Sequence, residues 1–190
     1  MQFIKDLDYF LCLWINNWAG RSAQLDVFGI FCADFLIFAI PLFIIFFYFF
    51  NRRNRLVLIF LKIILAAALS YLVNCLLNYI LGIFFIRPRP FVVFPEIYQL
   101  SKFLLSSESY SFPSDHTTIA FVMALVVFLD WRKFGIILLA LSLFVGLSRI
   151  FTGVHYPLDI FGGILTAFFS VWMVDTVFRK NKKFRSIQNF

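Results

Sequence analysis

Residues 26–50 read DVFGIFCADFLIFAIPLFIIFFYFF, an apolar run that contains only two charged side chains, Asp26 and Asp34. A helix needs about 20 predominantly apolar residues to cross the hydrocarbon core of a bilayer, so this run predicts a membrane-spanning helix, with a tolerated kink at Pro41. The whole chain has the same character, because 62% of its 190 residues are hydrophobic and 29 are phenylalanine. A soluble domain of this length could not bury so much apolar surface, and we therefore expect lipid to be its solvent.

Four more apolar runs follow, at about 56–82, 115–131, 134–150 and 157–178. The second and third of these are at the short end of the spanning range. No internal repeat, low-complexity linker or domain boundary is visible between them. The sequence therefore predicts an all-α membrane bundle of about five transmembrane helices, forming a single domain over residues 1–190.

A further helix is predicted at the amino terminus, over residues 3–18. Its broad apolar face is formed by Phe3, Leu7, Phe10, Leu11, Trp14 and Trp18. Lys5, Asp6 and Asp8 make this stretch a poor span. An amphipathic helix in the membrane interface, with its tryptophans at the level of the lipid headgroups, is the better interpretation.

The basic residues are unevenly distributed between the two sides of this bundle. Residues 51–55, residues 131–133 and the tail after residue 178 hold ten of the 17 lysines and arginines. Because short cytoplasmic loops are enriched in these residues, we expect those segments and the carboxyl terminus inside the cell and the amino terminus outside. Lys62, within the second span, is expected to snorkel inward. The net charge of +7 has the same explanation and does not indicate nucleic-acid binding.

This topology places several polar motifs on one face. Arg87 and Arg89 follow the second span, His116 opens the third, and residues 149–159 join the fourth to the fifth. All of them are expected on the extracytoplasmic side, where residues remote in sequence can form one site.

The first motif is Arg87-Pro88-Arg89-Pro90. The planar guanidinium of arginine suits phosphate oxygens, and proline stiffens the backbone that carries it. A basic loop that contacts lipid headgroups is the alternative interpretation.

The second motif surrounds His116, at the start of the third span. Ser114 or Asp115 is a suitable N-cap, and the free N–H groups of a helix start bind phosphate oxygens. His116 would then lie beside the anion with a proton for a leaving group. Helix capping alone, with an idle histidine, is the alternative.

The third motif is the most specific. His155 and Asp159 are four residues apart, so one helical turn lets the carboxylate hold one imidazole nitrogen and leaves the other free as a nucleophile or base. Pro157 is well placed to start that helix, and Arg149 can reach back across the loop. A locally paired interfacial histidine is the alternative. A divalent metal is disfavoured, because three arginines beside the two histidines suit an anion, and no cofactor is implied.

These residues resemble the type 2 phosphatidic acid phosphatase superfamily, the integral-membrane lipid phosphatases. That family carries a lysine, six residues, then Arg-Pro; Pro-Ser-Gly-His; and Ser-Arg, five residues, His, three residues, Asp. The matching positions occur in the same order over about 82 to 159, at Arg89-Pro90, Pro113-Ser114-Asp115-His116 and Ser148-Arg149…His155…Asp159.

Two positions depart from the family pattern. Gly82 stands where the family has its first-motif lysine, so that phosphate contact is missing or comes from elsewhere, for example from Arg87. Asp115 replaces the glycine of the second motif. Pro-Ser-Asp-His-Thr is similar to the branch that contains the undecaprenyl diphosphate phosphatases of bacterial cell-wall synthesis, a branch linked to bacitracin resistance.

The resemblance implies a metal-independent hydrolase of the bacterial plasma membrane that acts through a phosphohistidine. His155 would attack phosphorus and Asp159 would orient it. Arg89, Arg149 and Ser114 would hold the phosphate oxygens. His116 would protonate the departing oxygen and then activate water.

Polar residues inside the spans are additional candidates. Asp34 would approach the headgroup region or pair with an arginine. Asn78, one turn after Asn74, would face the substrate, and interhelical hydrogen bonding is the alternative for both asparagines. Asp175 is expected to pair with the basic tail.

The sequence therefore favours hydrolysis of undecaprenyl diphosphate to undecaprenyl phosphate and phosphate. Phosphatidate, phosphatidylglycerophosphate or lipid A are alternative substrates of the same chemistry. A membrane protein that binds or transports an anion without cleaving it is an alternative of another class. The partners implied are the lipid substrate and the bilayer, with no nucleic acid and no obligate protein partner.

Overall fold

The computed structural model describes residues 2–51, 55–84, 87–102 and 110–181, and all the regular secondary structure in these ranges is helical. The helices in chain order are α1 (Gln2–Asn16), α2 (Ala23–Ile30), the π-helical turn η1 (Phe31–Phe35), α3 (Leu36–Phe50), α4 (Leu56–Phe84), α5 (Pro90–Val93), α6 (Asp115–Asp130), α7 (Arg132–Phe151) and α8 (Pro157–Lys180). The predicted all-α membrane bundle is thus confirmed.

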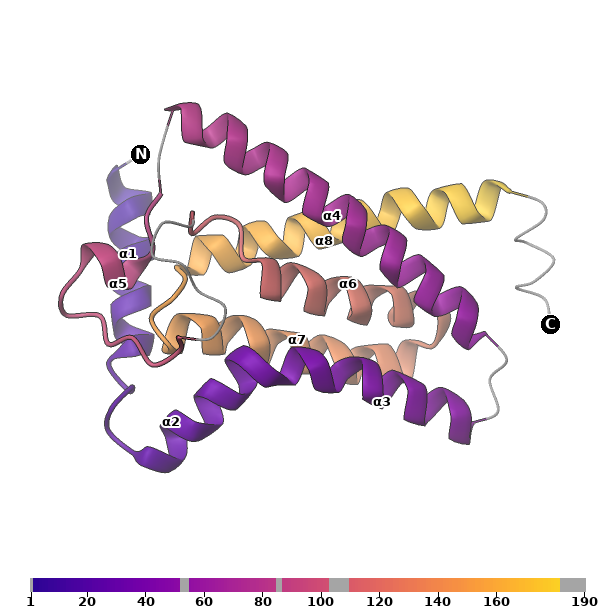
Figure 1. The fold of residues 1–190 in the computed structure, drawn as a ribbon, viewed down its shortest axis with the longest axis horizontal. Coiled ribbons are helices and arrows are strands. Elements are labelled where there is room, and N and C mark those ends of the chain that lie inside the picture. Colours follow the sequence, from indigo (N-terminus) through magenta and orange to yellow (C-terminus); the bar gives the residue numbers. More distant parts are fainter. Residues whose placement is uncertain (1, 52–54, 85–86, 103–109, 182–190) are drawn as a thin grey trace.

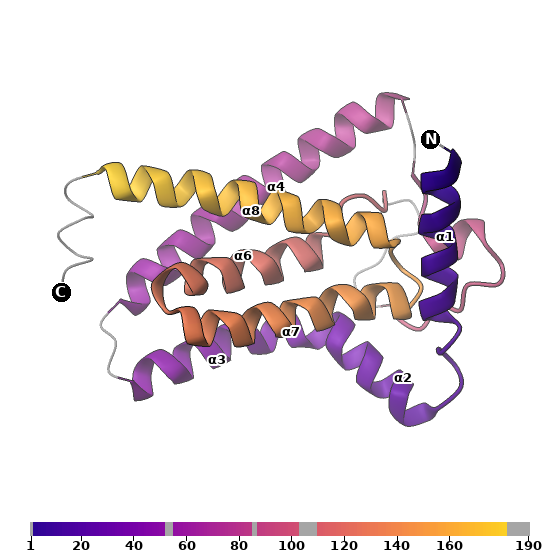
Figure 2. The same cartoon turned by 180° about the vertical axis from the view of Figure 1, so that it is seen from behind.

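The long helices run along one axis, and α1 crosses the bundle at one end (Figure 1). The ends of α4 and α7 and the beginnings of α6 and α8 lie at the same end as α1, whereas α8 ends at the opposite end (Figure 2). The segments that carry the three sequence motifs therefore meet beside α1.

The first span is continuous from α2 through η1 to α3. The sequence predicts a kink at Pro41, but the bend visible in Figure 1 lies where α2 and α3 meet across η1, and Pro41 lies farther along, inside α3. A π-helical turn widens the helix by one residue and reorients the next turns of the chain. Here that turn also carries the buried Asp34.

Four helices of the described chain meet the length and apolar composition of a candidate membrane span. They are Ala23–Phe50, Leu56–Leu81, Arg132–Phe151 and Pro157–Lys180. The fifth predicted span, 115–131, corresponds to α6, which has 16 residues and a length of about 24 Å at about 1.5 Å per residue. Although that is shorter than a hydrocarbon core of about 30 Å, α6 runs alongside its neighbours from the end that holds the site to the end where Asp130 pairs with Arg55.

Helix α6 forms the centre of the bundle. It packs against α3, α4, α7 and α8, and Val122, Ala124 and Val127 along it are completely buried. Its apolar sequence therefore faces protein. By contrast, Phe49 in α3 and Phe168 in α8 are largely exposed at positions that lipid would cover. Hydropathy alone does not separate these two environments.

Helix α1 buries its polar face. Asp8, Cys12 and Asn16, each one helical turn from the next, are its buried residues. Phe3 is 77% exposed and Trp14 is 60% exposed, so the predicted apolar face points away from the bundle. This arrangement fits a helix at the membrane interface, with lipid on one side and polar protein groups on the other.

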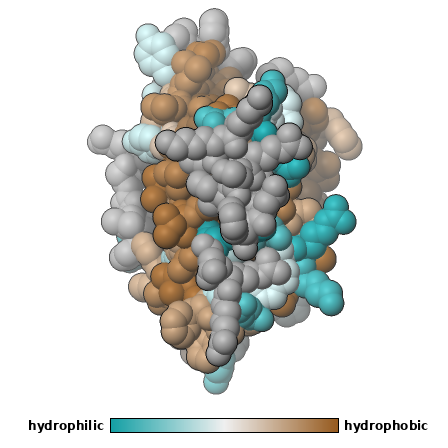
Figure 3. All heavy atoms as spheres, turned by 90° about the vertical axis from the view of Figure 1, so that its right-hand side faces the viewer, coloured by the Kyte–Doolittle hydropathy of each residue, from teal (hydrophilic) through white to brown (hydrophobic). Residues whose placement is uncertain are grey.

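Charged residues mark the opposite end of the bundle. The exposed or half-exposed basic residues described there are Arg55, Arg132, Lys133, Arg179 and Lys180. Figure 3 looks onto this end and shows hydrophilic residues among strongly hydrophobic ones. Lys62 does not snorkel as the sequence suggests: it is buried, and its Nζ lies 2.9 Å from Oδ1 of Asp175. Asp175 also pairs with Arg179, the first basic residue of the tail.

Candidate active site

The loop between α7 and α8 is shaped by its own backbone. Gly153 has a φ of +77°, a left-handed conformation, and a Cβ there would lie 2.7 Å from the carbonyl oxygen of Tyr98. The N–H groups of Val154 and His155 then donate to the carbonyl oxygen of Arg149, at 3.1 and 3.3 Å. This tight reversal turns the His155 side chain back into the bundle, where it is 3% exposed.

Helix α8 begins directly after this loop, with Pro157 in its first turn. The carboxylate of Asp159 accepts the backbone N–H of Tyr156 at 2.8 Å, which caps the helix and fixes the side chain. Its Oδ2 also accepts the hydroxyl of Ser111 at 2.5 Å. Asp159 is completely buried, so its position depends on these contacts.

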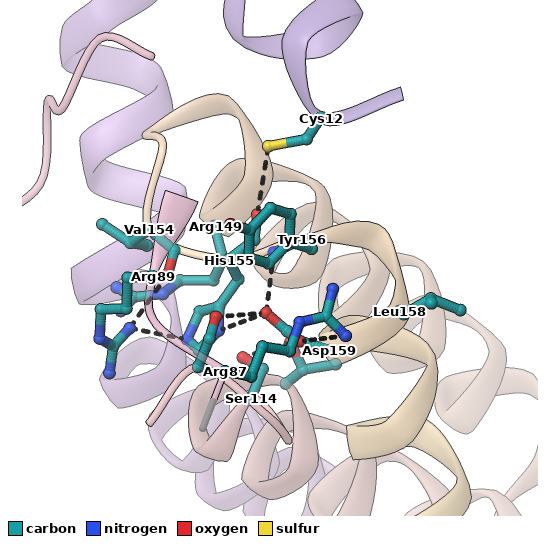
Figure 4. Close-up of polar contacts among 12 residues, drawn as sticks. Cys12, Arg87, Arg89, Ser114, Arg149, Val154, His155, Tyr156, Leu158 and Asp159 are labelled. Carbon is teal, nitrogen blue, oxygen red and sulfur yellow. Dashed lines mark hydrogen bonds and ion pairs between the residues drawn. The ribbon is translucent and has the colours of Figure 1, made fainter. Parts of the chain in front are cut away.

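His155 lies between a carboxylate and a guanidinium (Figure 4). Its Nδ1 is 3.3 Å from Oδ2 of Asp159, and its Nε2 is 3.3 Å from Nη1 of Arg89. Arginine nitrogens carry only donors, so the contact with Arg89 requires Nε2 to hold the lone pair. Nδ1 then carries the proton and donates it to Asp159.

The guanidinium of Arg89 is held in place by a backbone carbonyl of the loop between α7 and α8. It is the residue before α5, and its Nη1 also donates to the carbonyl oxygen of Val154 at 3.1 Å. The guanidinium is thereby tied to the loop that carries His155. Burial lowers the pKa of Arg89, but arginine stays charged at any physiological pH.

Arg149, in the last turn of α7, is 1% exposed. Its Nη1 donates to Oδ1 of Asp34 at 2.7 Å, and the same carboxylate accepts the hydroxyl of Ser101 at 2.8 Å. Of the two alternatives left open for Asp34, the structure therefore shows pairing with an arginine. The Nε of Arg149 has no hydrogen-bond partner among the described residues, so one donor of this guanidinium is unused.

The second motif packs against the start of α8. The backbone N–H of Ser114 donates to the carbonyl oxygen of Asp159 at 3.1 Å, and the Ser114 hydroxyl accepts that of Thr117 at 3.0 Å. Ser114 is the N-cap of α6, although its side chain makes no cap hydrogen bond. Gly163 permits this contact, because a Cβ there would lie 2.8 Å from the carbonyl oxygen of Ser114.

His116 follows in the first turn of α6. It is half-buried and lies within electrostatic range of Arg89, Arg149 and His155. Asp115 is exposed at the helix start and accepts a 2.7 Å hydrogen bond from Nδ2 of Asn74 in α4. Of the two interpretations of Asn74, a functional role or an interhelical hydrogen bond, the structure thus shows the hydrogen bond between helices.

Arg87 has different neighbours from Arg89. Its Nη1 lies 3.2 Å from Oδ1 of Asp159, its Nη2 pairs with Asp8, and its guanidinium stacks 4.4 Å above the ring of Tyr156. It therefore contacts the carboxylate on the Nδ1 side of His155, whereas Arg89 contacts Nε2.

Two further predicted positions lie in α4. Asn78 is half-buried in α4 and makes no hydrogen bond to the cluster within the described residues. Gly82 lies in the last turns of α4, but its surroundings are outside the part of the chain that the structure describes.

Two contributing residues have no motif that reveals them. Asp8 looks in the sequence like a charge that spoils a span, yet it is 5% exposed and contacts the start of α8. Ser111 lies just before the second motif with no distinguishing spacing. The one signal in the sequence for Asp8 was that it lies outside the apolar face of the predicted amphipathic helix.

Burial keeps the His155 imidazole neutral. Burial lowers the pKa of His155 to about 4, with Arg149 and Arg89 also lowering it and Asp159 acting in the opposite direction. At neutral pH the imidazole is therefore uncharged, with its lone pair directed toward Arg89. Arginines gathered at this side form a place for an anion, with a nucleophilic nitrogen beside it.

Comparison with known proteins identifies a family for this chain and similar proteins. A model of the PAP2 superfamily matches residues 59–183. The "bacitracin transport permease protein BcrC" of Bacillus licheniformis is 30% identical over 164 residues, covering 84% of this chain and 76% of that protein. The "undecaprenyl-diphosphatase BcrC" of Bacillus subtilis (strain 168) is 28% identical over 162 residues, covering 85% and 79%. The crystal structure of Aquifex aeolicus LpxE is similar with a TM-score of 0.63 and 27% identity, covering 87% of this chain and 93% of that one.

Proposed function

This chain belongs to the PAP2 superfamily and is a membrane lipid phosphatase, and we propose that its substrate is undecaprenyl diphosphate, which it hydrolyses to undecaprenyl phosphate and inorganic phosphate. The name of the Bacillus subtilis relative supports this substrate. The resemblance of Pro-Ser-Asp-His-Thr at 113–117 to the undecaprenyl diphosphate phosphatase branch also supports it.

The proposed reaction has two steps. Nε2 of His155 attacks the distal phosphorus, and the bond from that phosphorus to the bridging oxygen breaks as the N–P bond forms. The negative charge of the bound diphosphate favours the protonated form of His116 in the complex. The imidazolium of His116 then gives its proton to the departing oxygen, so undecaprenyl phosphate leaves and a phosphohistidine remains. His116 then takes a proton from water, whose oxygen attacks the same phosphorus. Inorganic phosphate is released and His155 is restored.

The phosphate oxygens are assigned to Arg89, Arg149 and Ser114. Charge builds on these oxygens in the transition state, and fixed donors in a site of low polarity stabilise it most strongly there. Asp115 stands at the exposed rim of the site, held by Asn74, where it can contact the lipid-bearing part of the substrate.

One observation carries the proposal. His155 has its Nδ1 against Asp159 and its Nε2 against Arg89, both at 3.3 Å. The carboxylate fixes the tautomer that leaves Nε2 unprotonated, and the guanidinium marks where an anion would meet that nitrogen. A merely structural histidine has no need of an anion-binding group at its free nitrogen.

The experiment uses purified protein in detergent, with a polyprenyl diphosphate as substrate and a chelator present. We expect phosphate release by the wild type and none by His155→Ala. Brief reaction with substrate labelled in its distal phosphate should leave an acid-labile, base-stable label on the wild type and on His116→Ala but not on His155→Ala. Unchanged turnover by His155→Ala would reject the mechanism.

A substrate panel tests the lipid separately. Phosphatidate, phosphatidylglycerophosphate and lipid A are compared with the polyprenyl diphosphate at equal detergent ratios. Far faster turnover of one of these would replace the proposed substrate while leaving the chemistry intact. Movement of the lipid or of an anion across vesicles, without phosphate release, would instead favour the transport interpretation.

The site is proposed to face the outside of the plasma membrane, with the carboxyl terminus in the cytoplasm. The support is the concentration of lysine and arginine at the end opposite the site. A cysteine introduced at Lys180 should be labelled by an impermeant reagent only after the cells are broken. Labelling in intact cells would reverse the orientation.

A further inference from the structure

The buried face of α1 lies along the loop that carries His155 and contacts its backbone at several points. Oδ1 of Asp8 accepts the backbone N–H of Leu158 at 2.8 Å. One turn later, Sγ of Cys12 lies 3.8 Å from the carbonyl oxygen of His155. One turn later again, Asn16 donates to the carbonyl oxygen of Phe151 at 2.8 Å. Three successive turns of α1 thus contact the backbone of the segment 151–158, first at its end, then near its middle and then at its beginning.

Asp8 also reaches the candidate catalytic residues through a side chain. Its Oδ2 pairs with Nη2 of Arg87, and Nη1 of the same guanidinium lies 3.2 Å from Oδ1 of Asp159. Oδ2 of Asp159 in turn holds Nδ1 of His155. A continuous series of polar contacts therefore runs from the amino-terminal helix to the proposed nucleophile, and Figure 4 shows Arg87, Asp159 and His155 of this series.

Arg87 compensates the negative charge of the buried Asp159 carboxylate. Asp159 is completely buried, and its Oδ1 accepts no hydrogen bond among the described residues. The ion pair with Arg87 is what compensates the charge at that oxygen. A buried carboxylate without a cation would favour its protonated form, and a protonated Asp159 would hold His155 less firmly.

The two carboxylates share Arg87 between them. Because Asp8 draws one edge of the guanidinium and the ring of Tyr156 covers its face, the other edge is fixed toward Asp159. A fork held in this way loses less conformational freedom when it pairs than a free side chain does.

We infer that Asp8 and Arg87 are positioning residues of the phosphatase, so that α1 is part of the catalytic apparatus: Asp8 holds Arg87 against Asp159, and Arg87 fixes the carboxylate that orients His155. This inference rests on the proposed function of the His155–Asp159 pair. It gives Arg87 a different role from that of a phosphate ligand.

The first test is Asp8→Asn in the full-length protein. Asparagine has the same shape, and its oxygen still accepts the N–H of Leu158, so α1 can stay docked while the negative charge is lost. We expect kcat to fall about ten- to hundredfold, as for a small misplacement of reacting groups, with KM within about twofold of wild type. The matched control is Asp6→Asn, an exposed position of the same helix, which should behave as wild type.

The second test is Arg87→Gln, alone and combined with Asp8→Asn. A positioning role predicts a fall in kcat with KM unchanged, and a double variant no worse than the poorer single one, because both changes break the same series of contacts. A raised KM in Arg87→Gln, or weaker inhibition by inorganic phosphate, would show that Arg87 binds the phosphate and would overturn the inference. So would an Asp8→Asn enzyme as active as Asp6→Asn.

A third test distinguishes loss of the Asp8 carboxylate from loss of the folded structure, by restoring a carboxylate to the Asp8→Ala variant. Asp8 and Arg87 line a cavity of about 590 Å³, so a small carboxylate can reach the place left by Asp8→Ala. We expect acetate to raise kcat of Asp8→Ala several-fold, with no such gain in Asp6→Asn or His155→Ala. Absence of rescue in protein that remains monodisperse would count against the inference.

Failure of the inference can be told from failure of the proposed function. If His155→Ala is inactive while Asp8→Asn is normal, the function stands and the role of α1 falls. If the wild type cleaves a different lipid phosphate, the same variants are compared on that lipid, and the role of α1 is tested although the substrate was wrong.

Discussion

Asp34 and Arg149 are 115 residues apart in the sequence, yet they form an ion pair of 2.7 Å in the interior of the bundle. Both are 1% exposed, so each charge depends on the other for its stability. The π-helical turn η1 directs the carboxylate at a guanidinium that closes α7. The pair joins the first span to the loop of His155 and fixes one proposed phosphate ligand before any substrate arrives.

Asp34→Asn is expected to lower both stability and activity. It leaves a buried arginine without a counter-charge, which costs about 3 kcal/mol in unfolding free energy when one partner of a buried pair is removed. Denaturant titration of the purified protein measures this, and Asp26→Asn, at a half-buried position near the start of the same span, is the control. Equal stability of the two variants would mean that the pair contributes little.

Arg89→Lys is expected to be almost as damaging as Arg89→Ala. The contacts of Arg89 with Nε2 of His155 and with the carbonyl oxygen of Val154 use a planar fork that an ammonium group cannot reproduce. Each variant should lose about 100-fold or more in kcat. Single-turnover measurements with saturating enzyme separate this loss from weaker binding. Wild-type rates in the lysine variant would show that charge alone suffices.

The acid limit of activity should lie well below the usual range of histidine. Burial lowers the pKa of His155 to about 4, so the nucleophile stays unprotonated at pH 5 to 8 and is lost as pH falls through about 4. The dependence of kcat/KM on pH measures this limit. An acid limb centred near 6.5, the ordinary value, would contradict the burial of this ring.

Acid should also destabilise the fold through the same residue. Histidine in the unfolded chain has a pKa of about 6.5, so between that value and about 4 the unfolded state binds more protons than the folded one. The stability that depends on neutral His155 is therefore present above about pH 6.5 and is lost as pH falls toward 4. His155→Gln should show a smaller fall of Tm over this interval, and parallel curves for the two proteins would refute the prediction.

Gly163→Ala is expected to separate α6 from α8 at the site. The added Cβ would lie 2.8 Å from the carbonyl oxygen of Ser114, so the segment before His116 would have to shift. Activity should fall more than stability, as judged by kcat and by the thermal midpoint. Leu165→Ala, on the exposed side of the same helix, serves as the control and should retain activity.

Local pattern was sufficient for most of the helices and for the main site residues. Apolar runs of about 20 residues predict helices in lipid whatever lies beside them, because no water is available to the backbone there. The separation of His155 and Asp159 by one turn likewise places both side chains on one face. The membrane bundle and the meeting of the three motifs could therefore be predicted from the order of the residues.

The partner of each charge could not be predicted from local pattern. Asp8 meets the start of α8 at Leu158, 150 positions away, and Arg87 meets Asp8, 79 positions away. Both contacts exist only because α1 crosses the end of the bundle. Likewise the central position of α6 in the bundle could not be predicted from its composition, since lipid and protein interior are equally apolar.

The sequence by itself determined that this chain folds in lipid, that its polar motifs gather at one end, and which imidazoles and guanidiniums the site contains. The tertiary structure alone decided that Arg89 faces Nε2 of His155 while Arg87 serves Asp159, and that Asp8 and Asp34 hold the two other arginines. The physical reason is the distance along the chain over which each effect acts. Apolar pattern and helical periodicity are set by residues within a few turns of each other. The partner of a buried charge depends instead on how whole helices cross.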